Sequence, residues 1–278
     1  MTIDEIILKA LREDIGEGDH TSLSTIPANA SGKARLLVKE DGVLAGVDIA
    51  RKVFFHTDER ILMEQFITDG TRVKVGDIAF EVSGPSIALL TAERTALNFM
   101  QRMSGIATQT WRMVDAIEGL PTKILDTRKT TPLLRVIEKI AVKLGGGFNH
   151  RFGLYDMILI KDNHVDFAGG IVKAISACHE YMDRKGLHLA IEIEARNLNE
   201  VNQILDHGGV DRIMLDNFSF DLLRQAVNLI GPTYETEASG GITLQTVRQY
   251  AECGVNYISV GALTHHINSL DLSLKAVE

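Results

Sequence analysis

The chain is poor in the residues that build disulfide frameworks and zinc knuckles. Only two of its 278 residues are cysteines, Cys178 and Cys253, and no CxxC motif is present. This spacing indicates neither a zinc knuckle nor a disulfide framework, so we expect two buried, inert thiols. Zinc sites of the HxxxH or HExxH type are not indicated either, because the sequence contains neither pattern.

Long apolar runs are also missing. No stretch approaches the roughly 18 residues that a membrane-spanning helix needs. The first residues, MTIDEIILKALREDIGEGDH, place acids among the apolar positions and do not form the uninterrupted apolar core of a signal peptide. From these absences we expect a cytoplasmic protein.

Positive charge is scarce too. The 29 Lys and Arg residues are outnumbered by 37 Asp and Glu residues, which gives a formal net charge of -8 at pH 7. Nucleic acids and anionic membranes require a broad basic surface, so neither is expected as a partner. Any basic site on this chain must therefore be local.

From about residue 123 onward, short apolar runs alternate with stretches of helical periodicity. The runs are KILDTRK, MILIKDN, LAIEIEA, RIMLDN, YETEASGG and YISVGAL, and their polar ends follow one another at intervals of 22 to 33 residues. This alternation predicts parallel strands joined by helices. Such an array closes into a barrel or stays open as a doubly wound sheet, and consecutive units with no evident switch favour the barrel.

In an α/β barrel the chemistry takes place at the carboxyl ends of the strands. Each predicted strand ends on a candidate residue there: Arg128 with Lys129, Lys161, Glu194, Asp216, Ser239 and Gly261. An alternative is that these residues are polar only because a strand end reaches solvent. That would explain one or two of the positions, but it explains six in order poorly.

Residues 1–118 have a different pattern. β-Rich segments with Asp-Gly and Gly-Asp turns surround a helix near residues 48–58, and a long helical stretch follows, with a possible break at Gly105. We therefore predict an N-terminal α+β domain over 1–118 that includes the linking helix, and a barrel domain over 119–264. The remaining residues, 265–278, are expected to pack back on the N-terminal domain.

Two glycine turns follow the last two predicted strands. Ser239, Gly240 and Gly241 end one strand, and Gly261 ends the next. Glycine lets backbone N–H groups approach an anion, and a helix N-terminus behind the turn adds positive potential. The pair of turns predicts a phosphate site, as in many βα barrels.

Cations gather on the earlier strand ends: Arg128, Lys129, His150, Arg151 and Lys161. Arginine forks bind carboxylates in a bidentate manner and lysine supplies a point charge, so the group suits a ligand with several carboxylates or phosphates. Glu192 and Glu194 share one face of their strand and, with Asp216, supply acids. Inward-facing acids need cations, hydroxyls or Mg²⁺ as partners, which fits a sugar with a metal.

Taken together, these blocks resemble the quinolinate phosphoribosyltransferases, also called nicotinate-nucleotide pyrophosphorylases (carboxylating). The resemblance runs through EDIGEGDHTS, ERTALNFMQRMSGIAT, LDTRKTTP, GGGFNHRFGLYDMILIKDNH, IEIEA, LDN, EASGGI and SVGALTH, in the family's order. It implies an N-terminal open sandwich and an incomplete, seven-stranded α/β barrel. It also implies that phosphoribosyl pyrophosphate and quinolinate react with Mg²⁺ to give nicotinate mononucleotide, pyrophosphate and CO₂, in de novo NAD biosynthesis.

The resemblance also implies roles for individual residues. Arg128, Lys129, His150, Arg151 and Lys161 would line the quinolinate pocket, and Lys129, Lys161, Glu194 and Asp216 would be catalytic. Glu194 and Asp216 would hold the ribose hydroxyls and Mg²⁺, the metal largely through substrate and water. Ser239, Gly240, Gly241, Gly261 and His265 would complete the substrate contacts. Arg102 would be inserted into the neighbouring subunit, which implies an obligate homodimer.

The chain departs from the family's pattern at Leu133 and Ile140, and at His266 after His265. These positions affect the pocket edge and the phosphate side. Three other functions stay open at this point: a lyase or aldolase with Lys161 as a Schiff-base nucleophile, a non-catalytic sensor of a dicarboxylate or phosphosugar, and a phosphoribosyltransferase with another acceptor, such as the homologue associated with molybdate transport.

Overall fold

The computed structural model describes residues 1–277, and the chain divides into two compact units. Unit 1 comprises Met1–Trp111, Thr130–Gly146 and the chain from Leu263 onward, and unit 2 comprises Arg112–Lys129 and Gly147–Ala262. The sequence predicted one continuous barrel domain over residues 119–264, with residues 265–278 packing back on the N-terminal domain. The two units instead alternate along the chain, since residues 130–146 interrupt unit 2 and belong with unit 1.

Unit 1 is built on a four-stranded antiparallel sheet. Its strands are β1 (Ser31–Val38), β3 (Leu62–Gln65), β5 (Ile78–Pro85) and β12 (Leu272–Val277), in the order β12-β1-β5-β3. The C-terminal strand pairs with β1 in antiparallel register, with Leu36 opposite Leu274. Alternate residues of β1, namely Ala34, Leu36 and Val38, are buried, as expected for a strand with one face on the core. A separate two-stranded sheet is formed by β2 (Gly42–Val43) and β4 (Arg72–Val73), which lie between β1 and β5 in the sequence.

Six helices contribute to unit 1. They are α1 (Ile3–Ile15), α2 (His20–Thr25), α3 (Val47–Thr57), the first part of α4 (Ser86–Ala116), α5 (Arg135–Leu144) and most of α11 (Ala262–His265). The break expected at Gly105 was wrong, because α4 continues through it for 31 residues. Glycine is needed there for a different reason: a Cβ on Gly105 would collide with the carbonyl oxygen of Asn268.

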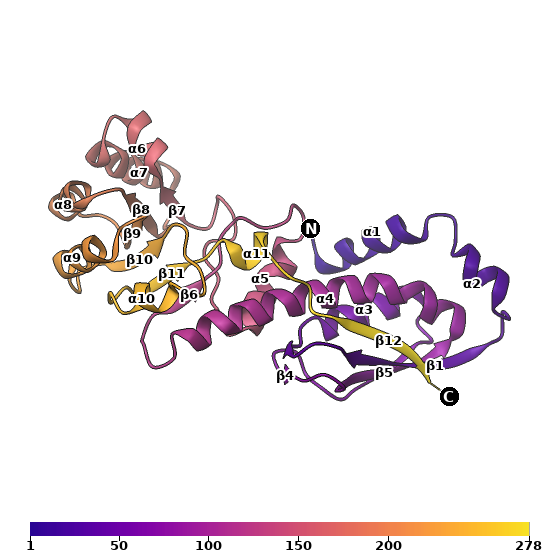
Figure 1. Ribbon diagram of the computed structural model, residues 1–278. Helices are drawn as coiled ribbons and strands as arrows, with labels where there is room; N and C mark the ends of the chain where they lie inside the picture. Colours follow the sequence, from indigo (N-terminus) through magenta and orange to yellow (C-terminus); the bar gives the residue numbers. More distant parts are fainter. Residues whose placement is uncertain (278) are drawn as a thin grey trace. The chain divides into compact units, whose positions relative to one another are not determined.

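Unit 2 is a parallel sheet with helices after most of its strands (Figure 1). The strands are β6 (Lys123–Leu125), β7 (Ile158–Ile160), β8 (Ile191–Ala195), β9 (Arg212–Asp216), β10 (Glu235–Ser239) and β11 (Tyr257–Ser259), in the order β6-β11-β10-β9-β8-β7. The helices are α6 (Asp162–Ala168), α7 (Ile171–Lys185), α8 (Leu198–His207), α9 (Phe220–Ile230) and α10 (Val247–Ala251). Sequence signals set their ends: Ser219 caps the N-terminus of α9 and Gly231 ends it.

The predicted α/β fold and the six predicted strands of unit 2 are confirmed. A seventh position is occupied in rudimentary form, because Phe148 makes an isolated parallel bridge to Leu125 on the outer side of β6. Closure of the sheet into a barrel stays a prediction. The expectation of two buried thiols was half right, since Cys253 is buried but Cys178 is partly exposed. Within residues 1–277 no helix is both long enough and apolar enough to cross a membrane.

Candidate active site

The predicted site residues of unit 2 lie at the carboxyl ends of its parallel strands, and these ends share one edge of the sheet. Glu194, Asp216 and Ser239 are in the last two positions of β8, β9 and β10. Lys161 directly follows β7, and Arg128 and Gly261 come shortly after β6 and β11. The structure therefore brings the cations, acids and glycines of unit 2 to the same edge.

Asp126 fixes the loop that carries two of the cations. Its side chain is fully buried just after β6. One carboxylate oxygen accepts the backbone N–H of His150 at 2.8 Å, and the other accepts the side-chain amide of Asn149 at 2.5 Å. The loop that begins at Gly147 is thereby tied to the end of β6, beside the Arg128 position.

The arginines of this edge lie close together. Burial lowers the pKa of the Arg151 guanidinium, and the neighbouring charge of Arg128 lowers it further. Arg151 donates from Nη1 to the carbonyl of Met157 at 3.2 Å, which anchors one arm of its guanidinium. Two cations that repel one another in a half-buried position are stabilised when an anion binds between them, so the pair suits a carboxylate ligand.

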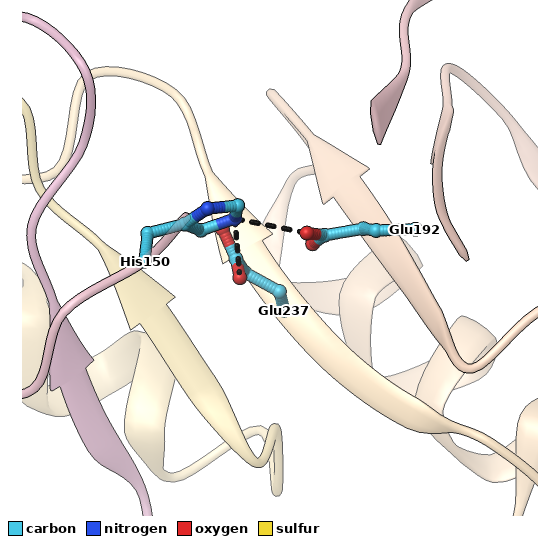
Figure 2. A group of neighbouring side chains, drawn as sticks. All are labelled: His150, Glu192 and Glu237. Atoms are coloured by element: carbon cyan, nitrogen blue, oxygen red, sulfur yellow. Dashed lines mark ion pairs between the residues drawn. The ribbon is translucent and has the colours of Figure 1, made fainter. Parts of the chain in front are cut away.

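His150 uses both of its ring nitrogens within the protein. Its Nδ1 accepts the backbone N–H of Arg151 at 2.7 Å, so the ring proton of a neutral imidazole lies on Nε2. That Nε2 lies 2.9 Å from Glu192 Oε2 and 3.5 Å from Glu237 Oε2, and the side chain is only 6% exposed. Figure 2 shows the imidazole between these two carboxylates.

The two carboxylates that face His150 belong to a group that we call the buried charge cluster. We define it as His150, Glu192, Glu237 and Arg212. Burial, the largest cause, raises the pKa of Glu237 to about 8 and that of Glu192 to about 7. Arg212 donates from Nη1 to Glu237 Oε2 at 3.1 Å and stacks over the ring of Tyr257 at 3.9 Å. One guanidinium therefore faces two buried acids.

Three members of this cluster, His150, Glu192 and Glu237, are spaced closely enough to hold a metal ion, since their ligand atoms lie within 4.8 Å of one another. The electrostatics argue against that role. The positive charge that two buried acids require is already supplied by Arg212, and a divalent ion there would be repelled by it. We therefore assign the cluster a structural role, in which the positive charge of Arg212 balances the buried acids.

Glu194 forms the second acidic group of this edge. Burial raises its pKa, and the nearby carboxylate of Asp216 raises it further, while Lys161 acts in the opposite direction. Asp216 is partly exposed and accepts a hydrogen bond from the Asn217 amide at 2.5 Å. Adjacent carboxylates offer hard oxygen donors of the kind that bind Mg²⁺, so these residues fit the predicted metal.

The glycine turn after β10 requires its glycines. Gly240 and Gly241 have φ values of 101° and 61°, and a Cβ on Gly240 would collide with the side chain of Asn217. The helix expected immediately behind this turn is not adjacent to it, because α10 begins only at Val247. Backbone N–H groups of the turn, rather than a helix N-terminus, are thus the donors available for a phosphate.

Two predicted residues belong to unit 1. Arg102, on α4, donates from Nε and Nη2 to Glu138 Oε1 at 2.9 and 2.5 Å, and from Nη2 to Thr131 Oγ1 at 2.5 Å. Glu138 is fully buried, and its other oxygen accepts the backbone N–H of Thr131 at 3.1 Å. His265, at the end of α11, contacts the ring of His266.

Four charged positions were not predicted from the sequence: the buried acids Asp126, Glu138 and Glu237, and the partly buried Arg212. Asp126 lies in LDTRKTTP and Glu138 follows shortly after it, but nothing in their spacing showed which N–H groups donate to them. Glu237 had a signal that was available: in ETEAS it alternates with apolar or small neighbours on a strand, as Glu192 does in IEIEA. The partners come from other strands, so the sequence did not show them.

Comparison with known proteins covers almost the whole chain. The family model for the quinolinate phosphoribosyl transferase N-terminal domain matches residues 19–104, and the model for the C-terminal domain matches residues 106–275. The chloroplastic nicotinate-nucleotide pyrophosphorylase (carboxylating) of Arabidopsis thaliana is 47% identical over 285 residues, covering 97% of this chain and 81% of that protein. The probable nicotinate-nucleotide pyrophosphorylase (carboxylating) of Bacillus subtilis (strain 168) is 44% identical over 262 residues, covering 94% and 89%.

A solved structure agrees with these sequence matches. The crystal structure of NadC from Streptococcus pyogenes superposes with a TM-score of 0.94 at 39% identity, covering 99% of this chain and 97% of that chain. Two family models that together span both units, and relatives well above 40% identity, are sufficient to assign a family. The chain therefore belongs to the quinolinate phosphoribosyltransferase family.

Proposed function

We propose that this chain transfers the phosphoribosyl group of phosphoribosyl pyrophosphate to quinolinate, with loss of CO₂, to give nicotinate mononucleotide and pyrophosphate. The reaction is a step of de novo NAD biosynthesis. Support comes from the family match over both units. The single observation of the structure that carries the proposal is that the cations after β6 and β7 and the acids of β8 and β9 all lie at the carboxyl-end edge of one parallel sheet.

Quinolinate is a flat ring with two adjacent carboxylates. Arg128 and Arg151 bind these carboxylates, since their guanidinium groups already lie close enough for one to depress the pKa of the other. Lys129 and Lys161 contribute further positive charge from exposed positions after β6 and β7. Bidentate and point-charge contacts together fix the orientation of the ring, and His150 borders the same pocket.

The phosphoribosyl group is bound by the other half of the edge. Glu194 and Asp216 accept hydrogen bonds from the ribose hydroxyls and are the residues that would hold Mg²⁺, largely through substrate and water. Mg²⁺ supplies positive charge that neutralises the departing pyrophosphate. The turn of Ser239, Gly240 and Gly241, together with Gly261, offers backbone N–H groups to the 5′-phosphate, and His265 is a further substrate contact.

The enzyme acts largely by holding its two substrates in the orientation that the reaction needs. The bond from ribose C1′ to the pyrophosphate oxygen breaks, the pair of electrons leaves with pyrophosphate, and the ring nitrogen of quinolinate bonds to C1′. Lys129 and Lys161 stabilise negative charge on the phosphates, and the carboxylates of Glu194 and Asp216 stabilise positive charge on the ribose ring. Because the pyridine nitrogen is a weak nucleophile, holding both reactants in line provides much of the rate.

Decarboxylation follows from the new bond. Once the nitrogen is quaternised, the bond from the adjacent ring carbon to its carboxylate breaks and CO₂ departs, while the electron pair stays on that carbon, where the positive nitrogen stabilises it. The ring carbon then takes up a proton. We assign no dedicated acid to this last step.

The experiment that tests the proposal is mass spectrometry of products. The purified protein is incubated with quinolinate, phosphoribosyl pyrophosphate and Mg²⁺, and a parallel reaction contains nicotinate in place of quinolinate. Nicotinate mononucleotide from quinolinate alone is the expected result. Absence of product from both reactions, with the protein folded, would contradict the proposal and direct attention to other acceptors.

The working enzyme in this proposal is a cytoplasmic homodimer in which Arg102 completes the partner's site. Its support is the family membership and the partial exposure of Arg102, whose side chain is 27% exposed. Mixing an Arg102→Ala chain with a Lys129→Ala chain tests it, because mixed dimers would contain one site that lacks neither residue. Recovery of activity is expected, and no recovery in verified mixed dimers would count against the sharing of Arg102.

A further inference from the structure

Apart from His150, the residues of the buried charge cluster have no part in the proposed chemistry. Glu192 and Glu237 come from β8 and β10, Arg212 comes from β9 between them, and His150 comes from the loop beside β6. Glu192 and Glu237 are fully buried, with a relative exposure of 0% each. Burying two carboxylates next to each other costs free energy of folding. We therefore asked which function could explain their presence.

Arg212 supplies positive charge to this cluster. It lies 3.1 Å from Glu237 and also binds Glu235 at 3.0 Å on its more exposed side. Glu192 and Glu237, which we call the acid pair, both face His150, at 2.9 and 3.5 Å from its Nε2.

The connection from this cluster to the ligand edge runs through the imidazole. His150 Nε2 faces the acid pair, and Nδ1 accepts the backbone N–H of the next residue, Arg151, at 2.7 Å. The backbone N–H of His150 is itself held by Asp126. Both ring nitrogens are therefore directed at protein groups, so the imidazole links the acid pair to the backbone of Arg151.

We propose that Glu237 is a positioning residue for the dicarboxylate acceptor: together with Glu192 it holds the ring of His150, and His150 fixes the backbone from which the Arg151 guanidinium reaches the ligand (Figure 2). This inference rests on the proposed function, in which Arg151 binds a carboxylate of quinolinate. Phosphoribosyl pyrophosphate is bound by other strand ends and does not depend on this connection.

Three variants of Glu237 test the role. Glu237→Leu keeps a side chain of similar size but removes the carboxylate that faces His150 and accepts a hydrogen bond from Arg212. Glu237→Asp retains the carboxylate but withdraws it by one methylene. Glu237→Gln retains an acceptor oxygen and the shape of the side chain. Glu235→Gln is the matched control, because Glu235 binds Arg212 on the same strand but is exposed and does not face His150.

The measurements are the KM values for both substrates and calorimetric binding of quinolinate without phosphoribosyl pyrophosphate. We expect Glu237→Leu to raise the quinolinate KM and Kd at least tenfold, while the KM for phosphoribosyl pyrophosphate stays within twofold. Glu237→Asp is expected to raise the same two quinolinate constants by a smaller factor. In Glu237→Gln and Glu235→Gln these constants are expected to stay within about threefold of the wild-type values.

Two outcomes would overturn the inference. One is an equal rise of both KM values, or a loss of kcat alone, in Glu237→Leu, since a merely structural role has no reason to select quinolinate. The other, which applies even when Glu237→Leu fails to fold, is a Glu237→Asp variant with unchanged quinolinate binding. A wild type that makes no nicotinate mononucleotide would contradict the proposed function instead, so the two failures are distinguishable.

Discussion

Both units bury carboxylates, but they satisfy them differently. In unit 1, Glu138 is a single acid that receives N–H groups from the Arg102 side chain and the Thr131 backbone. In unit 2, Glu192 and Glu237 form a pair with one guanidinium, and the pKa values of both are raised by burial. In the first arrangement one guanidinium serves one carboxylate, whereas in the second one guanidinium serves two. The comparison shows that buried acids in one chain are satisfied by different ratios of cation to carboxylate.

The largest expected effect comes from removing the cation of the acid pair. Arg212→Leu leaves two buried carboxylates without a positive partner and removes the stacking on Tyr257. We expect a loss of about 3 kcal/mol in the free energy of unfolding, measured by urea denaturation. Arg212→Lys, which keeps the charge but loses the fork and the stack, serves as the control and is expected to lose clearly less. Equal losses in the two variants would show that charge is not what the pair requires.

The corresponding change in unit 1 is expected to be smaller. Glu138→Gln keeps the volume and one acceptor oxygen but removes the charge that Arg102 binds. The loss of a charge-assisted hydrogen bond predicts a decrease of about 2 kcal/mol in the free energy of unfolding. Glu17→Gln, at an exposed position of the same unit, is the control and is expected to change nothing measurable. A Glu138→Gln protein as stable as this control would mean that the ion pair with Arg102 adds nothing to stability.

The two arrangements also predict different responses to pH. The pKa of Glu237 is raised from 4.5 to about 8, so the folded protein holds this proton more tightly than the unfolded chain does. The stability that this proton provides is fully present below the unfolded value and is lost as the pH rises through about 8. Thermal midpoints measured from pH 5 to 9 should therefore fall less steeply in Glu237→Gln than in the wild type. Parallel profiles would contradict the raised pKa.

Much of the fold was predictable because the strands of unit 2 are short apolar runs bounded by polar residues. The positions of Lys161, Glu194, Asp216 and Ser239 at strand ends followed from that pattern alone. The domain division was less predictable, since residues 130–146 join unit 1 through contacts that no local pattern encodes. Glu237 and Arg212 were not predicted for the same reason. A charged residue inside a protein is recognised by its partner, and the partner of each of these residues lies on a neighbouring strand.

The smallest predicted effect concerns the turn that supports the single acid of unit 1. Thr131, Pro132, Leu133 and Leu134 form a turn in which the N–H of Leu134 bonds the carbonyl of Thr131 at 3.1 Å. Leu133 has a φ of 69°, the conformation for which such turns with proline in second place favour glycine. Its side chain is 72% exposed, so little packing is lost on removal.

Leu133→Gly is therefore expected to stabilise the protein by about 0.5 to 1 kcal/mol. Relief of left-handed strain, about 1 to 2 kcal/mol for a residue with a Cβ, outweighs the greater freedom that glycine gives the unfolded chain. Leu133→Ala keeps the Cβ and separates strain from side-chain loss, so it should show no gain in the same urea titration. If alanine stabilises as much as glycine, the benefit comes from removing an exposed apolar side chain, and the backbone beside Glu138 is not strained.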